Sequence, residues 1–172
     1  YFGPKGYTIK KSSIDVIEHE KLRRDLTVSP FVPKSSMVQP TPFPIYRETQ
    51  DKFYLPKYFG IDKYGKHEIS KLNEGVDIAL AFNGSLFDYQ EQIVNKYTRV
   101  AEKDGGGLLE IGCGRGKTVI ALNIISKIKK KTLVIVHKEF LLNQWVERIQ
   151  QFLPTARVGR IQGQTMDIED KD

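Results

Sequence analysis

The stretch from residue 107 to residue 125, GLLEIGCGRGKTVIALNII, constrains this chain more than any other. It passes from a short apolar run at 108–111 through a glycine-rich turn into an apolar helix predicted to begin near Lys117. Because glycines remove side chains from the turn, its backbone N–H groups can point inward around an anion. The positive end of the helix dipole faces the same anion. The order strand, loop, helix therefore predicts a phosphate-binding loop.

The side chains that end this loop predict a nucleoside triphosphate as its ligand. Lys117 is placed to reach the β and γ phosphates, and the hydroxyl of Thr118 is placed to bind the Mg²⁺ ion that bridges them. Lys117 and Thr118 are therefore the candidate catalytic residues, and Thr118 is the candidate metal ligand. The loop residues predicted to bind the nucleotide are Gly112, Cys113, Gly114, Arg115, Gly116, Lys117 and Thr118.

The loop departs at one position from the usual spacing G-x-x-x-x-G-K-S/T, because Ile111 stands where the first glycine belongs. The remaining pattern, GxGxGKT, keeps the glycines nearest the phosphates. The alternative is a glycine-rich turn that joins a strand to a helix and binds nothing. A lysine and a threonine directly after the turn, between two apolar elements, favour the nucleotide loop.

Composition sets the outer limits of the interpretation. The 172 residues are 40% apolar, enough to bury a core, and the net charge of +6 is compatible with a polyanionic partner. The single cysteine, Cys113, excludes an internal disulfide and fits a reducing compartment. No apolar run approaches the length of a membrane span, and the first residues lack the apolar core of a signal peptide. We therefore expect a soluble intracellular protein without a membrane partner.

Residues 1–84 are predicted to form a small, strand-rich accessory unit. Six of the eight prolines lie between Pro30 and Pro56, and the proline-rich segment 31–46 is expected to be an extended linker or a sheet edge. The other expected elements are a strand at 7–10, a helix at 14–24 capped by Ser12 or Ser13, an alternating run at 26–31, a hairpin of 44–48 with 52–60, and a strand at 76–82.

Aromatic and basic residues alternate in the predicted hairpin, and this pattern has two interpretations. The side chains could stack on bases and neutralise phosphates, or the aromatic residues could be the core of a small sheet with lysines on its wet face. The second interpretation is preferred. The residues concerned are Tyr46, Arg47, Phe53, Tyr54, Lys57, Tyr58 and Phe59, with Lys63, Tyr64 and Lys66 just beyond.

Residues 85–172 have a different character, in which apolar strands alternate with amphipathic helices. The predicted elements are a helix at 88–102, a strand at 108–111, a helix from 117 that is closed by four lysines, a strand at 132–136, a helix at 139–153 and a strand at 157–161. This alternation is typical of an α/β fold in which a parallel sheet is wound with helices. Ligands of such sheets lie outside the carboxyl ends of the strands, where the glycine-rich loop is placed.

The order of motifs from Leu86 to about Gly163 resembles the opening of the first RecA-like domain of a superfamily 2 helicase. LFDYQEQIV is followed by GCGRGKT and then by TLVIVHKEFLLNQW. The chain is most similar to the XPB-like branch and to the helicases of nucleocytoplasmic large DNA viruses, including the poxvirus transcript-release helicase. The resemblance implies a partial RecA-like P-loop domain at 85–172, which binds ATP and Mg²⁺. Residues 1–84 resemble the unit that precedes the motor in the giant-virus members, but carry no motif.

The resemblance also assigns roles outside the loop. Gln90 corresponds to the glutamine with which the family reads the adenine edge, because an amide supplies both a donor and an acceptor. Otherwise Gln90 would be a solvated residue on the outer face of a helix. His137 and Lys138 stand in the motif whose helix N-terminus contacts the nucleic-acid backbone, where other members often have Pro and Thr. For Gln144 and Trp145 the alternative is ordinary helix packing, and this alternative is preferred for Trp145.

Two parts of a complete motor are not found in the sequence. An Asp-Glu pair at the end of a later strand and arginine fingers from a second RecA-like domain are both required for hydrolysis. The only late acidic cluster, DIEDKD from Asp167, follows a polar segment. We therefore expect a fragment that binds ATP or ADP weakly and does not turn ATP over.

The leading hypothesis is part of an ATP-dependent helicase or translocase that acts on nucleic acid, with DNA preferred over RNA. The alternatives are a non-catalytic nucleic-acid-binding module that uses the aromatic and basic hairpin, and another P-loop phosphotransferase. The viral resemblance implies transcription or virion functions, a partner in the transcription machinery, and a location in the virion or the host cytoplasm.

Overall fold

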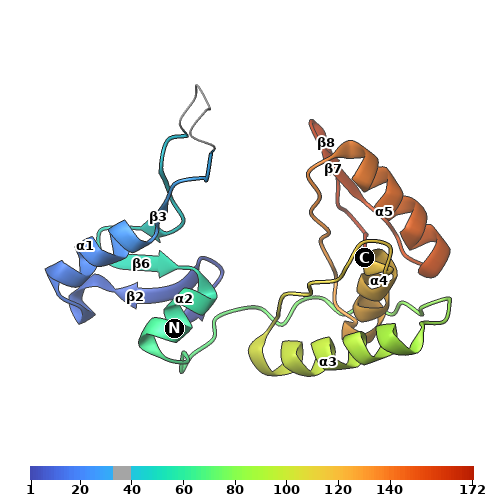
Figure 1. Cartoon of the computed structure of the whole chain (residues 1–172), viewed down its shortest axis with the longest axis horizontal. Coiled ribbons are helices and arrows are strands. Elements are labelled where there is room, and N and C mark those ends of the chain that lie inside the picture. The colour runs from blue at the N-terminus through green and yellow to red at the C-terminus, as the bar shows by residue number, and fades with distance from the viewer. Residues whose placement is uncertain (33–39) are drawn as a thin grey trace. The chain divides into compact units, whose positions relative to one another are not determined.

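The computed structural model describes residues 1–32 and 40–172, so that part of the proline-rich segment at 31–46 lies outside the described residues. The chain divides into two compact units, Tyr1–Glu74 and Gly75–Asp172, which are described separately (Figure 1). Residues 75–84 group with the second unit because their backbone bonds to it: the amide of Ile78 donates to Lys129, and that of Asn83 donates to Phe152. The division therefore lies ten residues before the boundary expected from the sequence.

The first unit is built on a four-stranded antiparallel sheet with the order β1-β2-β6-β5. Its strands are β1 (Phe2–Gly3), β2 (Gly6–Lys10), β6 (Lys52–Leu55) and β5 (Arg47–Glu48). The predicted strand at 7–10 is confirmed, and the first part of the predicted hairpin is confirmed by the pairing of β5 with β6. The segment around Ser70 bonds to Phe2 and extends the sheet beyond β1.

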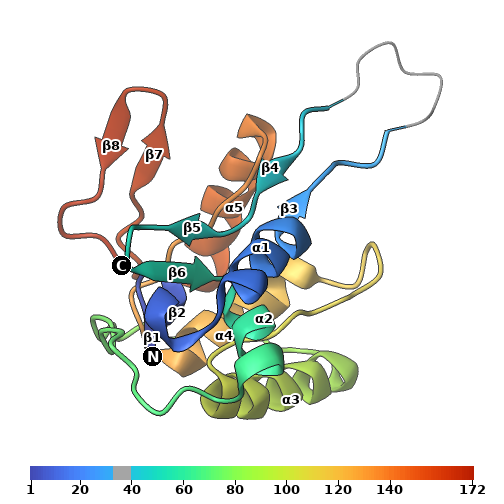
Figure 2. The same ribbon diagram turned by 90° about the vertical axis from the view of Figure 1, so that its left-hand side faces the viewer.

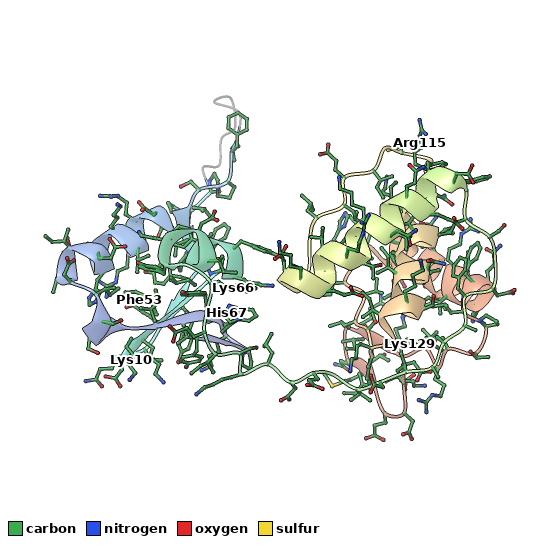
Figure 3. All side chains as sticks on the ribbon, turned by 90° about the horizontal axis from the view of Figure 1, so that it is seen from below. Lys10, Phe53, Lys66, His67, Arg115 and Lys129 are labelled. Carbon is green, nitrogen blue, oxygen red and sulfur yellow. The ribbon has the colours of Figure 1, made fainter. Side chains whose placement is uncertain are left out.

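One face of this sheet is covered by the helices α1 (Val16–Asp25) and α2 (Lys57–Tyr64). Tyr7, Phe53 and Leu55 point from the strands into a core that they share with Leu22 and Leu26. Phe53 and Leu22 are fully buried. The preferred interpretation of the hairpin, in which its aromatic residues form a core, is therefore confirmed for Phe53. In Figure 3, Phe53 lies on the helix side of the strands and Lys10 on the opposite side.

Two local predictions in this unit are wrong. The helix α1 is capped by Asp15, whose side chain accepts a hydrogen bond of 2.7 Å from the amide of Glu18, and not by Ser12 or Ser13, which belong to the short 3-10 helix at Lys11–Ser13. The run at 57–60 is the start of α2 rather than a continued strand. Pro56 explains the change, because proline has no N–H group with which to continue a ladder and is compatible with a helix start.

The predicted alternating run at 26–31 forms a strand only in part. The strand β3 (Thr27–Val28) pairs with β4 (Phe43–Pro44) in a separate two-stranded antiparallel ribbon. Both strands have two residues, and β4 contains a proline, as expected for a sheet edge.

The second unit contains the three predicted helices, α3 (Asp88–Asp104), α4 (Lys117–Ile128) and α5 (Glu139–Phe152). Figures 1 and 2 show α3 and α4 side by side, and their contact is a core of Val94 from α3 with Ile120 and Ile124 from α4. Leu109 and Ile111 pack against the same core. The apolar segment that leads into the glycine-rich turn is thereby held against the helix that leaves it.

The predicted parallel sheet is not confirmed. Among the described residues, 76–82, 108–111 and 132–136 form no strand, apart from one antiparallel bridge between Asp77 and Lys130. The last predicted strand is replaced by an antiparallel hairpin of β7 (Arg160–Gln162) and β8 (Thr165–Asp167).

The predicted parallel strands do not form because the apolar segments have no neighbouring strand among the described residues. A parallel strand takes its hydrogen bonds from strands that are distant in sequence and is normally covered on both faces. Here Leu108, Leu133 and Ile135 are 93%, 70% and 85% exposed. The result is a mixed α/β fold with three helices in the second unit, in which the apolar segments between them join no ladder among the described residues.

None of the helices in the described part of the chain is long and apolar enough to cross a membrane.

Candidate nucleotide-binding site

The glycine-rich turn adopts a backbone that only glycine accommodates without strain. Gly114 and Gly116 have φ angles of +74° and +75°, in the left-handed region. Gly116 is also the N-cap of α4, and no side chain caps that helix end. Because the first amides of a helix have no partner within the helix, this end of α4 leaves N–H groups open. The sequence prediction of a turn that opens directly into a helix is confirmed at Lys117.

Lys117 closes the loop from its far side. Its ammonium group donates hydrogen bonds of 3.1 Å to the carbonyl oxygens of Ile111 and Gly112, the residues at which the loop begins. The side chain is exposed, so both carbonyl contacts are made at the surface. The ammonium group therefore stays at the mouth of the loop and holds its two ends together.

Gln90 joins α3 to the loop. Its side-chain nitrogen donates to the carbonyl oxygen of Arg115 at 3.2 Å, and its side-chain oxygen accepts from the amide of Phe87 at 3.1 Å. The side chain is 4% exposed, which excludes the alternative of a solvated residue on an outer helix face. A Cβ atom at Gly116 would lie 2.5 Å from the Gln90 nitrogen, so a side chain there would displace the Gln90 amide in addition to straining the backbone.

Two aromatic residues beside Gln90 were not predicted as site residues. Phe87 and Tyr89 stack with their ring centroids 6.0 Å apart, and the guanidinium of Arg115 lies 5.6 Å from the Tyr89 centroid. The Tyr89 hydroxyl donates to the Arg115 carbonyl at 3.3 Å. Phe87 is 69% exposed, so an apolar ring stands open next to the loop. The sequence signal was the pair of aromatics that flanks Asp88, just upstream of the glutamine.

The metal prediction rests on Thr118 and on the chemistry of its hydroxyl. Thr118 is in the first turn of α4, and its hydroxyl makes no hydrogen bond within the described residues. No group of three or more His, Cys, Asp or Glu side chains in 1–32 and 40–172 is arranged to hold a metal ion. Mg²⁺ commonly takes one or two protein oxygens and completes its shell with phosphates and water, so a single threonine hydroxyl fits a nucleotide-borne ion.

Two of the four late acidic residues, Asp167 and Asp172, are engaged in ion pairs. Asp172 accepts from the guanidinium of Arg157 at 2.6 Å, which holds the pKa of its carboxyl below the usual value. Asp167 pairs with Lys171, four residues along the chain, at 3.1 Å. These contacts fit the expectation that the cluster is not the acidic pair of a motor.

His137 and Lys138 precede α5 and are exposed. Lys138 is the N-cap of the helix, its carbonyl accepts from the amides of Leu141 and Leu142, and no side chain caps this end. No hydrogen bond, ion pair or ring contact joins either residue to the glycine-rich loop in the described part of the chain. The structure therefore brings Gln90 and residues 112–118 together, and Figure 3 shows Arg115 of this loop. Residues 137–138 form a separate, exposed helix start.

Comparison with known proteins identifies the family of the segment that contains this site. The family model described as "Type III restriction enzyme, res subunit" matches residues 83–172, which contain the whole site. A protein of Acanthamoeba polyphaga mimivirus named "Putative ATP-dependent RNA helicase" is 37% identical over 164 residues, which is 91% of this chain and 31% of that protein.

Shorter matches fall in other large DNA viruses. A "Putative helicase" of Invertebrate iridescent virus 3 is 42% identical over 77 residues, covering 45% of this chain and 23% of that protein. A "Putative ATP-dependent RNA helicase" of African swine fever virus is 38% identical over 75 residues, covering 43% and 15%. The chain thus spans less than a third of the length of these relatives. It belongs to the family of the type III restriction enzyme res subunit, and with its viral relatives to the superfamily 2 helicases of large DNA viruses.

Proposed function

We propose that this chain binds ATP with Mg²⁺ through residues 112–118 and is part of an ATP-dependent helicase or translocase. The observation that carries the proposal is the backbone and side-chain geometry of the loop. Two left-handed glycines open the backbone, an uncapped helix start faces the opening, and the Lys117 ammonium spans the loop ends.

In the proposed complex, the ammonium of Lys117 leaves the carbonyl oxygens of Ile111 and Gly112 for the β and γ phosphates of ATP. The amides at the start of α4 hold the phosphate oxygens, and the Thr118 hydroxyl binds the Mg²⁺ ion. Magnesium would supply charge neutralisation between the phosphates. The exchange costs little, because Lys117 gives up two surface hydrogen bonds to neutral carbonyl oxygens and gains contacts with anionic phosphate oxygens.

We assign the adenine contact to Gln90 with Phe87. The amide of Gln90 already holds the loop through Arg115, and the exposed ring of Phe87 offers a face on which a base can stack. Binding of adenine by Gln90 requires that its amide exchange one present partner for the base. The names of the relatives support ATP as the nucleotide.

We propose further that the exposed start of α5, with His137 and Lys138, contacts the phosphodiester backbone of the nucleic acid. Uncapped helix amides and a lysine bind phosphate without reading sequence. A preference for DNA remains a prediction, since the mimivirus relative is named as an RNA helicase. Roles in transcription or in the virion belong to the same proposal.

We expect the chain by itself not to hydrolyse ATP. Two of its late acidic side chains, Asp172 and Asp167, are held in ion pairs with Arg157 and Lys171, and the described residues contain no group of three or more His, Cys, Asp or Glu that could hold a metal ion. In a protein as long as the relatives, the apolar segments 108–111 and 132–136 would gain strand neighbours and form the parallel sheet. Phosphate release stimulated by nucleic acid from these 172 residues alone would contradict this part of the proposal.

The nucleotide site is tested by calorimetric titration with ATP and Mg²⁺. Lys117→Ala should weaken binding at least tenfold, because it removes the only ammonium at the loop mouth among the described contacts. Lys96→Ala is the matched control, since Lys96 is exposed on α3 and its loss changes the charge equally. Equal affinities for the wild type and Lys117→Ala would reject the proposed site.

A further inference from the structure

The sheet of the first unit has a second face that no helix within the described residues of that unit covers. In an antiparallel sheet, neighbouring residues alternate between faces, and residues opposite one another on paired strands share a face. Phe53 and Leu55 point into the core, so Lys52 and Tyr54 point the other way. Lys10 is opposite Lys52, and Arg47 is opposite Tyr54.

On this face, lysine ammonium groups lie close to tyrosine rings. The ammonium of Lys5 lies 5.1 Å from the Tyr54 ring centroid, and those of Lys52 and Lys71 lie 5.9 Å and 4.7 Å from the Tyr1 centroid. We call this surface the helix-free face. Its members are Tyr1, Lys5, Lys10, Arg47, Lys52, Tyr54 and Lys71.

The two faces of the sheet differ in how their cations are neutralised. On the helix-covered side, Lys11 and Arg23 both pair with Glu48, at 2.6 Å and 2.9 Å, and Lys63 pairs with Glu18 at 2.6 Å. The contacts with Arg23 and Lys11 lower the pKa of the Glu48 carboxyl to about 2, chiefly through the hydrogen bond from Arg23.

On the helix-free face, no ion pair joins any of the five cations to a carboxylate in the described part of the chain. Five positive charges therefore share one small surface without internal neutralisation, and such a surface fits a polyanion. Lys5, Arg47 and Tyr54 also line a depression of about 590 Å³ at one end of the face. Its volume is within the range of roughly 300–1,000 Å³ that is typical of small-molecule sites, so it can admit a base.

We propose that the helix-free face of residues 1–74 binds single-stranded nucleic acid. The cations contact successive phosphates, and bases pack against the rings of Tyr54 and Tyr1, as is general for binding of single strands without sequence preference. A single strand is the occupant that fits, because its bases are free to reach the rings, whereas the bases of a duplex are stacked inside it. This surface is independent of the nucleotide loop and of the start of α5.

The sequence pattern alone could not make this assignment. Alternation of aromatic and basic residues indicated a nucleic-acid surface or a small core, and the structure divides the residues between the two. Phe53 belongs to the core, whereas Arg47 and Tyr54 lie on the opposite face.

The experiment is an anisotropy titration of the whole chain with a fluorescent 20-nucleotide oligo(dT), without ATP. The triple variant Lys10→Gln, Arg47→Gln, Lys52→Gln should bind at least tenfold more weakly. The dependence of log K on log salt should become shallower by about 2, from about 0.7 per lost phosphate contact on a single strand. The control Lys21→Gln, Arg24→Gln, Lys66→Gln removes the same charge from exposed positions on α1 and after α2, and should change affinity less than threefold.

Further arms test the kind of ligand. Tyr54→Leu should weaken binding about fivefold, as expected for a lost stacking contact, while Tyr54→Phe should not. Equal losses in both triple variants would show that net charge alone is responsible and would overturn the proposal. Equal affinity for a 20-base-pair duplex, or equal competition by polyglutamate, would do the same. Lys117→Ala should leave oligonucleotide affinity unchanged, so this test is separate from the test of the nucleotide site.

Discussion

The two units of the chain use their apolar residues in opposite ways. In Tyr1–Glu74, short antiparallel strands find partners that are close in sequence or joined by one connection, and Phe53 is fully buried beneath α1. In Gly75–Asp172, the helices pack around Ile120, but Ile135 remains 85% exposed. The difference teaches that an antiparallel unit can complete its sheet locally, whereas a parallel one depends on strands supplied from far along the chain.

The largest effect is expected for Phe53→Ala. It should destabilise the first unit by about 3–5 kcal/mol, because it deletes a fully buried ring and leaves a cavity. Amide hydrogen exchange in β2 and β6 should accelerate strongly. The single tryptophan, Trp145, lies in the second unit and provides the control. If Phe53→Ala lowered the unfolding midpoint reported by Trp145 fluorescence as much as that of the first unit, the two units would unfold together. The contrast between the two units would then be contradicted.

The next effect concerns the stability of the second unit and compares alanine substitutions at two glycines of the loop. Gly116→Ala should cost about 2 kcal/mol or more, from left-handed strain plus the clash with Gln90. Gly114→Ala has the same φ and open space around its Cβ, so it should cost only about 1–2 kcal/mol, which is the strain alone. Chemical denaturation followed by Trp145 fluorescence measures both. Equal losses would mean that Gln90 moves aside freely.

A smaller effect concerns acid stability of the first unit. The folded pKa of Glu48 is about 2, against 4.5 without its partners, so its contribution is present above pH 4.5 and is lost as the pH falls towards 2. Since the carboxyl is partly exposed, the contribution is about 1 kcal/mol. Glu48→Gln should lower stability by this amount at pH 7 and flatten its dependence between pH 4.5 and 2. An unchanged acid transition of the first unit would rule the contribution out.

The smallest effect is expected for Ile135→Ala. Because this side chain is 85% exposed, its truncation should change the stability of the chain by less than about 0.5 kcal/mol. Urea unfolding of the wild type and the variant would measure the difference. A loss similar to that of Phe53→Ala would mean that 132–136 is buried in solution and that the contrast between the units is incorrect.

The helices and the loop could be predicted from the sequence because their signals are local. Apolar spacing identified α3, α4 and α5, and the glycines before Lys117 identified the turn. The hairpin of β5 and β6 was also predictable, since its partners are separated by three residues. The same rules placed strands at 108–111 and 132–136, where the apolar runs exist but the described chain provides no ladder beside them.

Other features depend on tertiary contacts that no local pattern contains. The aromatic run after Pro56 has strand-like composition but forms α2, because Pro56 ends the ladder and Phe59 and Tyr64 then pack onto the sheet core. The bond from Gln90 to the Arg115 carbonyl requires α3 to lie against the loop. The Gln90–Phe87 bond and the stack of Phe87 on Tyr89 are local to the start of α3. The division of the hairpin residues between two faces follows from register, which the sequence leaves open.

The central claim is that residues 112–118 form a pocket for a nucleotide phosphate tail. It is tested most directly by following backbone amide signals of the labelled chain during titration with ATP and Mg²⁺. The account predicts that the amides of Gly114, Gly116, Lys117 and Thr118 shift first and saturate together, and that adenosine without phosphates does not reproduce these shifts. Unchanged loop amides at saturating ATP, or the same shifts with adenosine, would contradict it.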